Sequence, residues 1–165
     1  MQQAEPTYSP ITSDDLIRVR AVADYQFGKG AGEILFPDNI EAVKSRKTGK
    51  VKAIYENGTL LATLKPSDGF LALAIGGAKR LKAALKFPSY RVAVLDEVVD
   101  VIKEGRNVFA KHVFLADPKI RPGEEVLVTD RRDEIIAVGR ATLNGEEMKR
   151  FKIGLAVKVR KGDTD

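Results

Sequence analysis

Residues 105–128 read GRNVFAKHVFLADPKIRPGEEVLV. Gly105 follows a short helical pattern over 97–104, and glycine is the usual left-handed residue after the end of a helix. Proline and glycine turn signals separate the strand-like segments that come next. Further strands are expected on both sides, so this half is mostly β with one short helix, which suits a small barrel. The predicted strands cover 90–95, 108–115, 125–129, 134–143 and 155–160.

The part of the chain before this region has a different pattern. Ser13 is the expected N-cap of a helix over 13–27, and Asn57-Gly58 is a strong signal for a hairpin turn between two strands. Together with strands near 40–45, 51–56, 59–65 and 70–74 and a helix over 75–85, the pattern predicts a small antiparallel sheet with helices. Pro88 ends that last helix, so the expected domains are residues 1–87 and 88–165.

Composition excludes several kinds of chemistry. The 165 residues contain no Cys and one His, which excludes Cys nucleophiles, Cys-based metal sites and any site that needs two imidazoles. The glycines at 28, 30 and 32 follow a predicted helix rather than a strand, so we interpret them as a helix-ending loop and not as a nucleotide site. We therefore expect no metal, no cofactor and no catalytic residue.

The sequence shows no recognisable targeting signal. The first 15 residues lack the basic and apolar regions of a signal peptide, and no apolar run approaches the roughly 18 residues of a membrane span. The expected location is the cytoplasm, with no membrane partner. His112 lies among apolar residues and is predicted to be a half-buried strand histidine, with no assigned role.

Positive charge points to polyanions as partners. The formal net charge is +5, and residues 44–52 hold five cations and no acid. Arg46, Lys47 and Lys50 at this predicted turn have two open interpretations: contact with a phosphate backbone, or protection of a sheet edge. A looser basic group lies in residues 149–160. In a chain without a catalytic set, these groups favour a binding module over an enzyme.

The quoted segment also carries a family resemblance. Together with IAVGRA at 136–141 and GLAVKV at 154–159, it resembles a PUA domain. The first half, through VADYQFGKGAGEILFP at 22–37, resembles the domain that precedes PUA in archaeosine tRNA-guanine transglycosylases. The fold class that this resemblance implies is α+β, with a small α/β N-terminal module followed by a PUA-type β pseudobarrel.

The resemblance implies RNA binding rather than base exchange. In that family the PUA domain grips tRNA around the acceptor stem and its 3′ end, while a separate barrel with carboxylates and zinc ligands exchanges the base. That barrel has no counterpart in these 165 residues. The chain is therefore expected to bind tRNA or another structured RNA in tRNA modification, either independently or with a separate transglycosylase catalytic subunit. The alternatives are a protein-interaction scaffold and an RNA-modification enzyme without a recognisable catalytic set.

By motif position, the resemblance also implies which residues contact RNA. They lie on the short helix, in the glycine loop after it, on the next strand and on the C-terminal strand: Lys103, Gly105, Arg106, Asn107, Lys111, Lys158 and Arg160.

Overall fold

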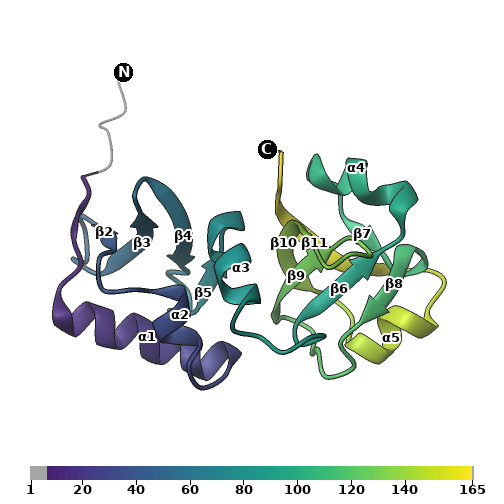
Figure 1. The fold of residues 1–165 in the computed structure, drawn as a ribbon, viewed down its shortest axis with the longest axis horizontal. Coiled ribbons are helices and arrows are strands. Elements are labelled where there is room, and N and C mark those ends of the chain that lie inside the picture. The colour runs from purple at the N-terminus through teal and green to yellow at the C-terminus, as the bar shows by residue number, and fades with distance from the viewer. Residues whose placement is uncertain (1–6, 165) are drawn as a thin grey trace. The chain divides into compact units, whose positions relative to one another are not determined.

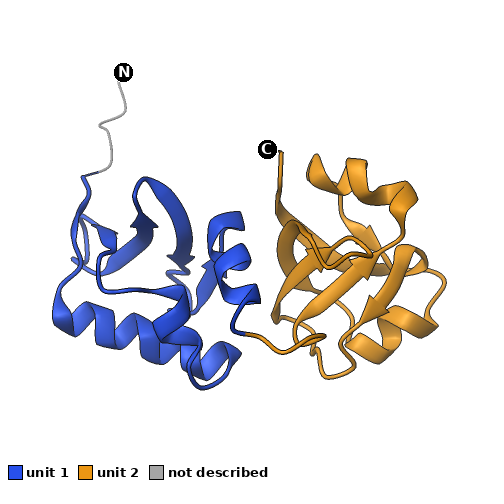
Figure 2. Cartoon of the chain, viewed as in Figure 1, with its two compact units in different colours: residues 1–84 blue, residues 85–165 orange. Residues whose placement is uncertain are grey.

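The computed structural model describes residues 7–164. The chain divides into two compact units, unit 1 over residues 1–84 and unit 2 over residues 85–165 (Figure 2). Each unit is built on its own sheet, five-stranded in unit 1 and six-stranded in unit 2 (Figure 1). None of the helices in residues 7–164 has the length and apolar character to cross a membrane.

Unit 1 is an antiparallel sheet in the order β1-β2-β3-β4-β5 with three helices. Asn57 and Gly58 have φ values of 49° and 80° in the tight turn between β3 and β4, as their sequence predicts. The exposed loop between β2 and β3 carries the basic residues at 46–50. The elements are β1 Ser9–Pro10, α1 Ser13–Phe27, α2 Ala31–Leu35, β2 Glu41–Lys44, β3 Val51–Glu56, β4 Thr59–Leu64, β5 Leu71–Leu73 and α3 Ile75–Lys82.

Helix α1 covers the predicted residues, but its cap lies one residue earlier than expected. Thr12 is the N-cap, and its hydroxyl oxygen accepts a hydrogen bond from the Asp15 N–H at 3.2 Å. After the helix, Asp24 Oδ1 accepts from the Gly32 N–H at 2.7 Å. Gly32 lies so close to the Arg20 carbonyl that a Cβ would overlap it. The absence of a side chain at Gly32 therefore lets α2 pack tightly against α1.

Unit 2 has the strand order β7-β11-β10-β9-β6-β8. Strands β7 and β8 lie at opposite ends of this order, yet three residues separate them in the chain. The two edges must therefore come close together, which curls the sheet into a nearly closed barrel around an apolar core (Figure 1). The elements are β6 Arg91–Val94, α4 Val99–Lys103, β7 Val108–Phe109, β8 Val113–Ala116, β9 Glu125–Thr129, β10 Ile135–Ala141, α5 Gly145–Arg150 and β11 Leu155–Gly162, with 3-10 turns at Asp96–Val98 and Ala110–His112.

Two expectations for this half were wrong. The single strand over 108–115 is broken by the turn Ala110–His112, because β7 pairs with β11 whereas β8 pairs with β6. The half also contains a second helix, α5, which is held by a capping box. Asn144 Oδ1 accepts from the Glu147 N–H at 2.8 Å, and Glu147 Oε1 accepts from the Asn144 N–H at 2.9 Å. The Asn-x-x-Glu spacing was a readable signal for this helix.

The start of unit 2 is fixed by Arg91, which is 2% exposed. Its guanidinium donates to the carbonyls of Leu85 at 3.3 Å and Ser89 at 3.0 Å, and it pairs with Asp133 at 3.2 Å. A buried guanidinium needs this degree of hydrogen bonding to offset its lost hydration. Arg91 thus holds the segment before β6 against the turn that joins β9 to β10.

Candidate nucleic-acid interface

The glycine loop begins with a Schellman motif at the end of α4. Gly105 has φ +104°, its N–H donates to the Ile102 carbonyl at 2.9 Å, and the Arg106 N–H donates to the Val101 carbonyl at 3.2 Å. This turn satisfies the last carbonyls of the helix and sends the chain out of the helical path. Lys103 lies in the last turn of α4, and Arg106, which follows Gly105, is exposed.

The loop is fixed along β11. Asn107 Oδ1 accepts from the Val159 N–H at 3.0 Å, just beyond the last β7–β11 pair, Val108 with Val157. At the far end of β11, Gly162 lies so close to the Lys103 carbonyl that a Cβ would overlap it. The structure therefore places residues 103–107 beside β11, the strand that holds Lys158 and Arg160.

A further cation lies beside Lys158. Arg140 is directly opposite Lys158 on β10, and both side chains are exposed. Paired residues on neighbouring strands point to the same face of a sheet, so the two charges lie side by side. Arg140 was not among the RNA-binding residues expected from the sequence. The signal was present, because Arg140 is the polar position in an otherwise apolar strand.

Arg160 has a different environment from Lys158. It is the extra residue of a β-bulge, since Val159 pairs with Gly139 and Lys161 pairs with Val138. Its guanidinium binds both carboxylate oxygens of Glu125, at 2.8 Å and 2.6 Å. The Glu125 side chain is 1% exposed, whereas that of Arg160 is 36% exposed. Arg160 is thus the counter-ion of a buried carboxylate, a structural task that sequence reasoning missed.

Lys111 is exposed on the turn Ala110–His112, which packs against α5. His112, on the same turn, is half-buried, and its carbonyl accepts from the Leu95 N–H at 3.0 Å. The last turn of α5 and the residues after it add exposed Lys149, Arg150 and Lys152. No acidic residue occurs from 148 to 162, the segment that runs from α5 through β11.

The basic loop between β2 and β3 belongs to unit 1. The Ser45 carbonyl accepts from the Gly49 N–H at 2.8 Å, which closes the turn and leaves Arg46, Lys47 and Lys50 exposed. These three residues therefore form an exposed basic group within unit 1.

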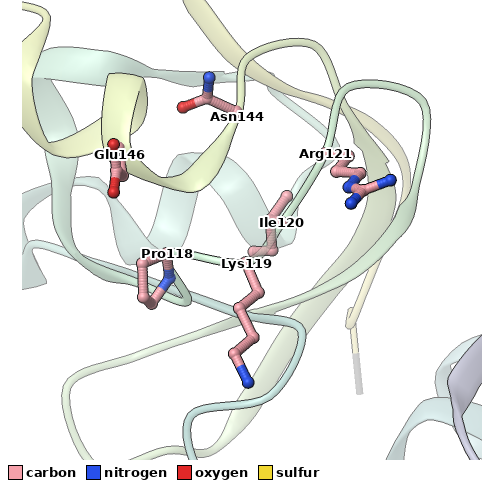
Figure 3. A pocket seen from close by; sticks show the side chains of 6 residues that line it. All are labelled: Pro118, Lys119, Ile120, Arg121, Asn144 and Glu146. Atoms are coloured by element: carbon pink, nitrogen blue, oxygen red, sulfur yellow. The ribbon is translucent and has the colours of Figure 1, made fainter.

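A shallow pocket of about 400 Å³ lies between the loop before β9 and the start of α5. Asp117 fixes this loop, because its Oδ1 accepts from the Lys119 N–H and its Oδ2 accepts from the Tyr90 N–H, both at 2.9 Å. Figure 3 shows that the side chains of Lys119 and Arg121 extend in different directions. The pocket therefore does not focus two cations on one anion.

Comparison with known proteins defines the class of both units. Residues 90–162 match the family model of the PUA domain. Residues 17–88 match the model described as the patch-forming domain C2 of tRNA-guanine transglycosylase. The chain therefore contains a C2 domain of tRNA-guanine transglycosylase followed by a PUA domain, which confirms the resemblance found in the sequence.

Curated relatives are much longer than this chain. It is 48% identical over 151 residues to the tRNA-guanine(15) transglycosylase of Methanothermobacter thermautotrophicus, a match that covers 92% of this chain and 23% of that protein. The enzyme of the same name from Thermococcus kodakarensis is 52% identical over 144 residues, which cover 87% of this chain and 24% of that protein. The chain thus spans about a quarter of the length of the curated relatives that it matches.

Solved structures agree with the fold class. A hypothetical protein from Pyrococcus horikoshii superposes with a TM-score of 0.76 at 22% identity, over 96% of both chains. A conserved PUA domain protein from Thermoplasma acidophilum gives a TM-score of 0.70 at 21% identity, over 96% of this chain and 95% of that one. The predicted α+β fold with a PUA-type pseudobarrel is confirmed.

Proposed function

We propose that this chain binds tRNA through unit 2 and serves tRNA modification together with the catalytic region of a tRNA-guanine transglycosylase, carried by a separate subunit in the cytoplasm. The observation that carries the proposal is the link between the glycine loop and β11. The Asn107–Val159 hydrogen bond supports the proposal, because it fixes the loop after Arg106 beside β11, the strand that carries Lys158.

The chemistry of this surface suits a phosphate backbone. Lys158 and Arg140 are adjacent cations, and Glu125, which lies opposite Arg140 on β9, is bound by Arg160. Two neighbouring exposed cations repel each other and are stabilised when an anion lies between them. Phe109, two residues before Lys111, is 47% exposed, and Phe151, between Arg150 and Lys152 in the sequence, is 43% exposed. Exposed aromatic rings among cations are typical of surfaces that bind RNA bases as well as phosphates. The names of the relatives support tRNA as the RNA.

The experiment is a salt titration of tRNA binding with two matched triple variants. Replacing Arg106, Lys111 and Lys158 with Ala removes three cations from unit 2. Replacing Arg46, Lys47 and Lys50 with Ala removes the same charge from unit 1. Each phosphate contact contributes roughly 0.7 to 0.9 log units of affinity per tenfold change in salt.

We expect the unit 2 variant to lower the salt slope by about two log units per tenfold change in salt, and the unit 1 variant to change it less. Equal salt slopes for the wild type and the unit 2 variant would mean that the RNA site lies elsewhere. A decrease in slope confined to the unit 1 variant would mean that the site is the basic loop. A chain that binds no tRNA at low salt, yet keeps a protein partner after nuclease treatment, would favour the scaffold alternative.

A further inference from the structure

Helix α1 has an apolar row on the side that faces away from the core of unit 1. Its inner face buries Val19, Ala23 and Phe27. On the other side, Ile17 is 68% exposed and Tyr25 is 80% exposed. Ala21, also exposed, lies between them at the four-residue spacing that places side chains in one row along a helix. Single exposed apolar residues are normal, whereas apolar side chains that lie together on one face are typical of interaction sites.

The row ends in a preformed aromatic pair. The rings of Tyr25 and Phe70 stack with their centroids 5.9 Å apart and their planes 6° from parallel, and Phe70 is itself 38% exposed. Gln26 fixes the backbone beneath this pair. Its Nε2 donates to the Leu71 carbonyl at 2.9 Å, and its Oε1 accepts from the Leu71 N–H at 3.0 Å. A partner that binds here does not have to order the end of α1 or the start of β5.

The charges of α1 do not suit RNA. The helix contains three carboxylates, at 14, 15 and 24, and two guanidiniums, at 18 and 20. Arg20 pairs with Asp38 at 3.0 Å, which reduces its availability to a phosphate. Asp15 likewise pairs with Lys44 at 3.3 Å. Helix α1 therefore has no excess of positive charge to attract a phosphate backbone, whereas Tyr and aliphatic side chains without excess charge are typical of the core of a protein interface.

The length of the relatives indicates which protein would cover this row. In the Methanothermobacter and Thermococcus enzymes, the part that matches this chain makes up 23% and 24% of one longer protein. The same module therefore belongs with about three times its own length of transglycosylase chain. We propose that Ile17, Ala21, Tyr25 and Phe70, the α1 row, dock onto an apolar face of the transglycosylase catalytic subunit; this inference rests on the proposed function.

A photo-crosslinking amino acid at position 17 tests the occupant directly. The full chain is expressed in its source cells and irradiated, and the product is identified by mass spectrometry after nuclease treatment. A cross-link to a protein that matches the transglycosylase region missing from this chain supports the proposal. A cross-link to RNA, to a second copy of the chain or to an unrelated protein overturns it, as does the absence of any cross-link.

Substitutions test the energetics of the row. Ile17→Asp and Tyr25→Asp should each lower capture of the catalytic subunit by tagged chain at least tenfold, as expected for central interface residues. Ile153→Asp is the matched control, because Ile153 is 85% exposed but lies on unit 2. Unchanged capture with Ile17→Asp, or an equal loss with Ile153→Asp, would contradict the proposal.

The tRNA titration separates this inference from the proposed function. Both α1 variants should melt like the wild type, since exposed positions tolerate substitution, and they should keep the wild-type salt slope for tRNA. If the chain binds tRNA normally but no catalytic subunit is found at the α1 row, only the docking proposal is refuted. Loss of tRNA binding in the unmodified chain would refute the proposed function itself.

Discussion

Replacing Arg160 with Ala should destabilise unit 2 far more than replacing an ordinary surface arginine. The substitution leaves the Glu125 carboxylate, with its 1% exposed side chain, without the two charge-assisted hydrogen bonds at 2.8 Å and 2.6 Å. Removing one partner of a fully buried ion pair costs about 3–5 kcal/mol. Because the Arg160 side chain is 36% exposed, water can reach the carboxylate from that side, and we expect about 2–3 kcal/mol.

Calorimetry of the purified chain measures this cost. In a unit of this length each kcal/mol lowers the melting temperature by roughly 4–8 °C, so the transition of unit 2 should fall by about 10–20 °C. Lys158→Ala is the control on the same strand, because Lys158 is exposed and lies opposite another cation, Arg140. Its melting temperature should stay within about 3 °C of the wild type.

A double substitution distinguishes the buried charge from lost packing. Replacing both Glu125 and Arg160 with Leu removes the buried carboxylate together with its counter-ion and should recover most of the stability that Arg160→Ala loses. If Arg160→Ala and Lys158→Ala have the same melting temperature, the Arg160–Glu125 ion pair does not stabilise unit 2. If it melts low as expected, a fall in its tRNA affinity cannot be assigned to a lost phosphate contact, which is why the triple variant above omits Arg160.

Three further predictions concern single residues. Gly105→Ala should cost roughly 1 kcal/mol, because φ is +104° but an added Cβ would meet no atom within 4 Å; a lower melting temperature with normal tRNA affinity would show that the loop only ends the helix. Asn144→Ala removes the capping box of α5 and should cost about 1 kcal/mol in urea unfolding, whereas Asn144→Asp should retain most of it. Burial, followed by the charges of Glu124 and Asp117, raises the pKa of Tyr90 above its ordinary value of 10.0. The folded chain thus holds this proton longer than the unfolded chain does, and stability that is fully present below about pH 10 is lost as the pH rises through the folded pKa. Tyr90→Phe should make that decline shallower in urea titrations between pH 9 and 11, and an unchanged decline would contradict it.

The amino-acid sequence by itself determined the features that depend on neighbouring residues. The 13–27 helix, the Asn57-Gly58 turn and the glycine at position 105 follow from backbone preferences within a few residues, and the structure has all three. The family resemblance likewise depends on short segments whose order in the chain is fixed. These features do not depend on which strands pair, so they can be predicted from the sequence before the fold is known.

Tertiary structure decided the features that depend on residues far apart in the chain. The break at Ala110–His112 exists because the strands before and after it form opposite edges of the sheet: β7 pairs with β11, and β8 pairs with β6. No local sequence pattern shows which strands pair. Arg160 meets Glu125, 35 positions earlier, because both β9 and β11 pair with β10. The sequence shows a cation at 160 and an acid at 125, but only the register of three strands makes one the counter-ion of the other. The same register places Arg140 beside Lys158, since cross-strand neighbours are set by pairing and not by distance along the chain.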